Sequence, residues 1–102
     1  MPGNIPAVTH AVVLISAERA ALADLGGRLA DLEGVAEVYS VTGEWDFVAI
    51  LRVATPEDVA RVVTKRLASV PGIHRTSTMV AFEAFSRHDL EAMFSIGEPG
   101  AS

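Results

Sequence analysis

The chain has 102 residues, a length typical of one domain, and 50% of them are hydrophobic against 21% charged. Its formal net charge of −5 at pH 7 opposes the basic surface that binds nucleic-acid phosphates, so direct contact with DNA or RNA is not expected. The absence of cysteine excludes disulfides, thiolate metal sites and cysteine nucleophiles.

The sequence predicts a cytoplasmic protein with no membrane segment. Its N-terminus does not resemble a secretory signal, and the longest apolar run, residues 11–15, is far too short to span a bilayer. The apolar content is nevertheless higher than a small monomer needs, which suggests that some of it is buried against another subunit.

The first half of the chain predicts a strand, a helix and a second strand. Residues 7–16 form a strand that is apolar on both faces in its second half, as expected for a central strand. Residues 18–32 carry leucines at three- and four-residue spacing, which is typical of a helix that buries one face. Inside that helix, Gly26 and Gly27 indicate either close packing on a strand or a weak point. Residues 35–41 predict a second, more polar strand near an edge.

The second half repeats this order. Residues 47–53 predict a third strand that is again apolar on both faces. A threonine-proline start, with Asp58 completing a capping box, predicts a helix over residues 55–69. After a proline-glycine break, residues 73–85 predict a long fourth strand.

The resulting order predicts an α+β fold, a ferredoxin-like βαββαβ sandwich. Right-handed crossovers place both helices on one face of an antiparallel four-stranded sheet, with the first and third strands in the middle. The other face is apolar as well, so we expect dimerisation through the open sheet face. A short C-terminal helix after Ser86 completes a domain over residues 7–94, between a flexible N-terminus over residues 1–6 and a flexible tail over residues 95–102.

The connection between the second and third strands, residues 41–46, holds the only tryptophan of the chain, Trp45, between Glu44 and Asp46. One interpretation is a polar hairpin tip in which Gly43 allows the reversal and the aromatic ring packs back on the sheet. The other is a recognition loop, because loops held by rigid strands often carry function.

A second group of polar side chains, Thr76 and Thr78, shares one face of the fourth strand. Both residues are good strand formers, and cross-strand hydrogen bonding alone could explain them. They could also offer short, neutral donors and acceptors to a small polar ligand. A backbone N–H near Gly43 could then receive a carboxylate and Asp46 an ammonium, a combination that suits a free amino acid.

Enzyme chemistry has little support in the sequence. The histidines, His10, His74 and His88, lack metal-ligand spacing, and neither a nucleophile elbow nor a phosphate-binding loop occurs. Two acids one residue apart on a turn, Glu44 and Asp46, make a poor acid/base pair. We therefore expect no catalytic residues, no metal and no cofactor.

Two stretches of the sequence resemble a known family. Residues 34–47 contain a valine-rich strand that ends in T-G-x-x-D, and residues 71–78 read P-G-I-x-x-T-x-T. Both resemble the effector domain of the Lrp/AsnC (feast/famine) transcription regulators, called the RAM domain, and the similarity runs from about residue 8 to residue 85.

The resemblance implies a non-enzymatic effector domain whose homodimers assemble further, often into an octamer-like ring. It also implies that an amino acid binds between dimers, at the loop after the second strand. Carried over by position, the ligand-binding residues are Thr42, Gly43, Glu44, Trp45, Asp46, Thr76 and Thr78.

One departure concerns the N-terminal helix-turn-helix domain of full-length members, because only a few residues precede the first strand here. We expect a stand-alone RAM protein, which could act by itself or by assembling with a full-length Lrp/AsnC regulator. One alternative is a small, monooxygenase-like enzyme of the dimeric α+β barrel type, with a closed cavity lined by His10 or His74. Another is a purely structural oligomerisation protein whose loop makes only subunit contacts.

Overall fold

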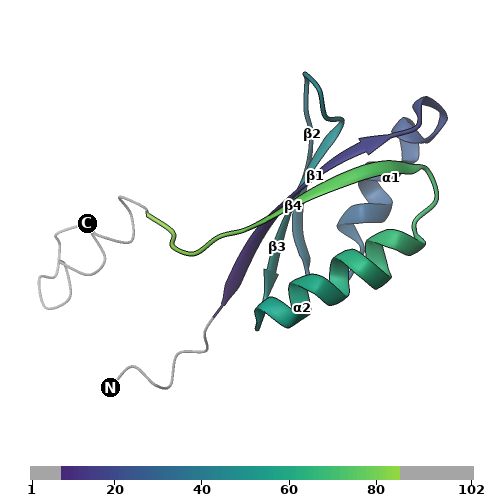
Figure 1. The fold of residues 1–102 in the computed structure, drawn as a ribbon. Coiled ribbons are helices and arrows are strands. Elements are labelled where there is room, and N and C mark those ends of the chain that lie inside the picture. The colour runs from purple at the N-terminus through teal and green to yellow at the C-terminus, as the bar shows by residue number, and fades with distance from the viewer. Residues whose placement is uncertain (1–7, 86–102) are drawn as a thin grey trace, which may run out of the picture.

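The computed structural model describes residues 8–85, which form one antiparallel sheet with helices on one of its faces (Figure 1). The strands are β1 (Thr9–Ala17), β2 (Val35–Ser40), β3 (Phe47–Val53) and β4 (Ile73–Val80). They lie side by side in the order β2-β3-β1-β4, with every neighbouring pair antiparallel. The predicted ferredoxin-like α+β fold, with the first and third strands in the middle, is confirmed.

Both crossovers are helical, but only part of each is an α-helix. The first contains a 3-10 turn, η2 (Arg19–Ala21), and then α1 (Leu22–Ala30). Glu18 stays extended because its N–H donates to the carbonyl oxygen of Gly72 at 2.8 Å, which delays the helix start. The second crossover contains α2 (Pro56–Arg61), a π-helical turn η3 (Val62–Arg66) and a 3-10 turn η4 (Leu67–Ser69). Within residues 8–85, these helices all fall short of the length and apolarity that crossing a bilayer requires.

The start of α2 is closed by the capping box that the sequence predicts. The hydroxyl of Thr55 accepts a hydrogen bond from the N–H of Asp58 at 3.2 Å. In return, the Asp58 carboxylate accepts one from the N–H of Thr55, also at 3.2 Å. Two donors that a helix start leaves unpaired are thereby satisfied, which fixes where the second crossover begins.

The core lies between the helices and one face of the central strands. Along β1 and β3 every second residue points into it, which matches the period of a strand. In the described residues, all fully buried side chains are apolar: Ala11, Val13, Ile15, Leu25, Leu29, Phe47, Ala49, Leu51, Val59, Val62 and Leu67. A polar cavity beneath the helices, which the barrel-enzyme alternative requires, is therefore not found among them.

The two glycines of α1 have different surroundings. A Cβ on Gly26 would lie 3.3 Å from Cε1 of Phe47, so this glycine allows α1 to approach β3 closely. A Cβ on Gly27 would meet no atom within 4 Å. The expected close packing on a strand is thus present at the first glycine, whereas the second has no packing reason.

The opposite face of the sheet carries a second row of apolar side chains. Leu14 of β1 lies between Val48 of β3 and Ser77 of β4, and the neighbouring row places Val12 between Ile50 and Met79. The four apolar residues on the two central strands are only half-buried in the single chain: Val12, Leu14, Val48 and Ile50. No helix of residues 8–85 covers this face (Figure 1).

Three predicted strands had boundaries that were wrong by one to five residues. The strand expected over residues 7–16 spans Thr9–Ala17, the one expected to end at residue 41 ends at Ser40, and the one expected to reach residue 85 ends at Val80. Among the described strands β4 pairs with β1 alone, and it stops near the start of β1: Val80 lies opposite Ala11, and one further hydrogen bond joins the N–H of Ala81 to the carbonyl of His10 at 2.9 Å. The C-terminal helix expected after Ser86, and the segments 1–6 and 95–102, lie outside the described residues.

Candidate ligand-binding loop

The loop between β2 and β3 is a closed hairpin tip. The N–H of Val41 donates to the carbonyl of Asp46 at 3.0 Å, which joins the two ends of the loop. Gly43 has φ +105°, a backbone conformation that residues with a Cβ rarely adopt. A Cβ at this position would meet nothing within 4 Å, so it is the backbone conformation and not lack of space that favours glycine.

Asp46 attaches this loop to the end of β1. Its N–H donates to the carbonyl of Ile15 at 2.9 Å, and its carboxylate oxygen Oδ2 accepts from the N–H of Ala17 at 2.8 Å. The residue is half-buried, so these bonds are partly shielded from water. The acid that closes the T-G-x-x-D pattern therefore positions the loop within its own chain.

Arg75 contacts the same loop from β4, the strand that pairs with β1. Its guanidinium carbon lies 4.4 Å from the centre of the Trp45 ring, within the range of a cation–π contact. Its Nη2 lies 3.0 Å from the Oε2 of Glu44. Arg75 was not among the residues that the sequence predicted, although the predicted strand order already placed the start of the fourth strand beside the end of the first.

The contact between Arg75 and the loop is weak and exposed. The two charged side chains are 54% and 70% accessible to solvent. Ion pairs at this exposure contribute only about 0–1 kcal/mol, because water and salt screen them. The stacking on Trp45 adds about 0.5–1 kcal/mol at an exposed site. Replacing the Arg75–Glu44 ion pair by contacts with another charged group therefore costs little free energy.

The two predicted threonines lie on the other side of the sheet. Thr76 and Thr78 pair with Ile15 and Val13 of β1, whose side chains point into the core, so both threonines share the helix-covered face of β4. Arg75 lies on the opposite face, because it pairs with Ser16. Within a single chain, the structure brings together residues 42–46 and Arg75 but leaves the threonines apart from them.

Thr76 instead lines a shallow groove of about 220 Å³ between β4 and the end of the second crossover. The groove has an apolar wall that includes Val63, Leu67 and Ile73. His74 also lines it, beside an irregularity where the β1–β4 register shifts. His10 pairs with Arg52 at the other end of β1, so the structure does not bring these two histidines together. The third histidine, His88, lies outside the described residues.

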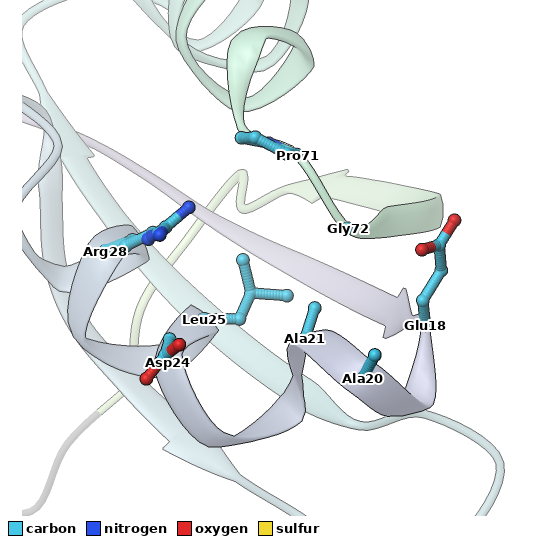
Figure 2. Close-up of a pocket in the computed structure, with 8 residues that line it drawn as sticks. All are labelled: Glu18, Ala20, Ala21, Asp24, Leu25, Arg28, Pro71 and Gly72. Atoms are coloured by element: carbon cyan, nitrogen blue, oxygen red, sulfur yellow. The ribbon is translucent and has the colours of Figure 1, made fainter.

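A larger groove of about 260 Å³ lies between α1 and the turn before β4 (Figure 2). Ala21 and Leu25 point from the helical segment toward the turn, with Glu18 at one end and Arg28 at the other (Figure 2). A Cβ on Gly72, whose φ is +95°, would collide with the Cβ of Ala21, so this glycine is required for close packing. None of the seven predicted ligand-binding residues lines this groove.

A third groove, of about 300 Å³, is rich in arginine but electrically balanced. Each of its arginines pairs with an acid of the chain, at 2.6–3.3 Å. The pairs are Arg52–Glu37, Arg61–Asp58 and Arg66–Glu33. The groove therefore lacks the surplus of positive charge that an anion site requires. Nor do the described residues contain a cluster of three or more His, Asp or Glu suited to a metal ion.

Comparison with known proteins gives one consistent family. The sequence model described as the Lrp/AsnC ligand binding domain matches residues 10–90. An uncharacterised HTH-type transcriptional regulator of Pyrococcus furiosus is 37% identical over 59 residues, which are 58% of this chain and 39% of that protein. The chain spans less than half the length of the curated relatives that it matches.

Solved structures share the fold. A Thermus thermophilus protein, TTHA0845, superimposes with a TM-score of 0.73 at 43% identity, covering 78% of this chain and 99% of that one. A transcriptional regulator of Neisseria meningitidis, solved as a complex with L-Met, gives a TM-score of 0.72 at 16% identity, covering 84% of this chain and 57% of that one. At this low identity, the second similarity concerns the fold alone.

Proposed function

The chain belongs to the Lrp/AsnC family of ligand-binding domains, and from that premise we propose that it is a non-enzymatic effector domain that binds a free amino acid. Its assembly, alone or with a full-length regulator of the same family, would then control transcription, as the names of its relatives suggest. The observation that carries the proposal is the loop over residues 42–46, which is fixed to β1 by Asp46 and contacted by Arg75 of β4. The setting that fits such a regulator is the cytoplasm.

The proposed ligand site consists of the loop and of two threonines from a second copy. The loop offers the residues Thr42, Gly43, Glu44, Trp45 and Asp46. Thr76 and Thr78 lie on the other face of their own sheet, so we assign them to a neighbouring subunit that approaches the loop. In this arrangement Asp46 fixes the loop, while Glu44, whose side chain is exposed, is the acid available to an ammonium group.

Assembly follows from the open face of the sheet. An apolar row along two central strands is unfavourable in water, and stacking the sheet on that of a second copy covers it. We propose a homodimer formed through Val12, Leu14, Val48 and Ile50. Larger rings of dimers, such as an octamer, would bring loops from neighbouring dimers together and complete the ligand site.

The amino-acid class of ligand is supported by two independent considerations. The charges at the loop, one acid and one guanidinium, match the two ends of a zwitterion. The Neisseria meningitidis regulator that shares this fold was solved with L-Met. A purely structural role for the loop remains the competing function, because the Arg75 contact could also serve only to rigidify it.

A thermal-shift screen of the full chain against the twenty standard amino acids, followed by calorimetry of any that bind, tests the proposal. A ligand that binds only the folded state at about 100 times its Kd stabilises that state by about 2.7 kcal/mol, which gives a clear rise in Tm. Trp45→Ala should abolish the shift. The matched control is Phe82→Ala, which truncates an aromatic ring that is 98% exposed and lies beyond β4. Intact oligomers that bind none of the amino acids would contradict the proposal and favour a structural protein.

A further inference from the structure

Arg75 contacts two residues of the loop at once. Its side chain extends from β4 on the open face of the sheet, opposite Ser16. There it lies over the Trp45 ring at 4.4 Å and contacts the Glu44 carboxylate at 3.0 Å. A planar guanidinium held against an aromatic ring presents its remaining N–H groups in a fixed direction.

The Arg75–Glu44 pair has the same two charges that a bound α-amino acid requires. The carboxylate of the ligand needs a cation, and its ammonium needs an anion. In the single chain both side chains are more than half exposed, so the pair can be separated there without leaving either charge buried and unpaired. The second acid of the loop, Asp46, is already engaged with the N–H of Ala17 through one carboxylate oxygen.

We propose that Arg75 binds the α-carboxylate of the amino acid while Glu44 accepts its ammonium, so that the ligand replaces their ion pair. This inference rests on the proposed function and adds a specificity-determining residue to it. Trp45 keeps the guanidinium oriented during the exchange, which allows the two parallel hydrogen bonds that arginine forms with a carboxylate. Without ligand, the guanidinium and the carboxylate pair with each other.

The proposal makes a chemical distinction among ligands. A compound that retains the amine and side chain but lacks the carboxylate charge, such as the amino-acid methyl ester, loses the contact with Arg75. A compound that lacks the ammonium, such as the N-acetyl derivative, loses the contact with Glu44. Both should bind more weakly than the parent amino acid, whichever amino acid the site prefers.

Calorimetry on the full chain tests this assignment, with the amino acid that gives the largest thermal shift in the screen and its methyl ester as probes. Removing a charge-assisted hydrogen bond typically weakens binding about 10- to 100-fold, and this loss is expected for the amino acid with Arg75→Gln. Arg75→Lys should lose less, since it keeps the charge but not the planar fork. Trp45, the only tryptophan, reports the exchange independently through its fluorescence.

The decisive readout is the ratio of the two affinities. Wild-type protein should prefer the amino acid over its ester, and Arg75→Gln should remove that preference, because the group that reads the carboxylate is gone. Arg61→Gln is the matched control: it breaks another exposed ion pair, its arginine being 55% accessible, on α2. This control should leave both affinities unchanged.

The outcomes separate the two proposals. If wild-type protein binds no amino acid, the proposed function fails and the assignment of Arg75 fails with it. A second outcome is that wild-type protein binds the amino acid but Arg75→Gln weakens the binding of the amino acid and of its methyl ester equally. In that case Arg75 only supports the loop, and the assignment alone is overturned. Equal affinities of Arg75→Gln and Arg61→Gln for the amino acid would overturn it as well.

Discussion

The carboxylate of Asp46 accepts a hydrogen bond from the backbone N–H of Ala17, with 2.8 Å between Oδ2 and N. This bond joins the end of the loop to the end of β1 across 29 residues of sequence. Together with the bond from the Asp46 N–H to the Ile15 carbonyl, it makes the position of the loop dependent on the central strand. A rigid strand thus determines where Glu44 and Trp45 lie.

Asp46→Ala should destabilise the fold, because it leaves the partly buried N–H of Ala17 without its acceptor. An unsatisfied donor of this kind costs about 1–3 kcal/mol. Asp46→Asn should cost less, since its amide oxygen can accept the same bond. Urea unfolding monitored by circular dichroism measures both; equal stabilities of wild type and Asp46→Ala would show that the bond contributes nothing.

Gly27→Ala should stabilise the protein by about 0.5–1 kcal/mol, because alanine is the better helix former and the position has open space. Gly26→Ala is the matched comparison within α1. Its Cβ would press on the ring of Phe47 at 3.3 Å, so the gain in helix propensity is offset by crowding. Thermal unfolding should rank Gly27→Ala above Gly26→Ala, and the reverse order would contradict this packing.

Ile50→Asp should convert the proposed dimer to a monomer that remains folded. In the single chain Ile50 is only half-buried on the open face, so a carboxylate there stays in contact with water. In a dimer stacked through that face the charge would be buried and unpaired, which costs several kcal/mol. Sedimentation velocity measures the change, with Leu22→Asp on the exposed side of α1 as control. A folded dimer of Ile50→Asp would place the interface elsewhere.

The Tyr39 hydroxyl donates a 2.7 Å hydrogen bond to the Glu37 carboxylate, which raises the pKa of Tyr39 above its usual 10.0. The negative charge of Glu37 acts in the same direction. Since only the protonated phenol can donate, the bond stabilises the fold below pH 10.0 and is lost as the pH rises through the raised pKa.

Glu37→Gln should therefore shift the tyrosinate titration to lower pH, because it removes the negative charge and leaves only a weaker, neutral acceptor for the Tyr39 hydroxyl. Tyr39 is the only tyrosine of the chain, so the change in ultraviolet absorbance on phenol ionisation reports this residue alone. Glu57→Gln, which makes the same change in net charge at the start of α2, should leave the midpoint in place. An unchanged midpoint in Glu37→Gln would contradict the contact.

Alternation and capping rules were enough to predict the architecture. The central position of β1 and β3 followed from their two apolar faces, and the start of α2 followed from Thr55 and Asp58. The end of β4 did not follow, because it depends on where β1, its neighbour among the described strands, begins. A local cap can set the limit of a helix, whereas the end of an edge strand depends on the strand beside it.

The candidate site could be predicted only in part, for the same reason. The loop was visible as a glycine, an aromatic residue and acids between two strands. Its attachment to Ala17 and its contact with Arg75 join residues that are distant in sequence, and they depend on the register of β4 against β1. The same register separates Thr76 and Thr78 from the loop within one chain. The proposed site, which takes residues from two copies, therefore has to be tested on the assembled protein.

Light scattering of the full chain, with and without a pool of amino acids, tests the central claim most directly, since it measures assembly and its dependence on ligand together. We predict a species no smaller than a dimer without ligand, and a change in mass or in the distribution of oligomers when the pool is added. Trp45→Ala should assemble but fail to respond. A mass that is identical with and without the pool, in a protein whose melting temperature the pool also leaves unchanged, would contradict an amino-acid-responsive effector domain.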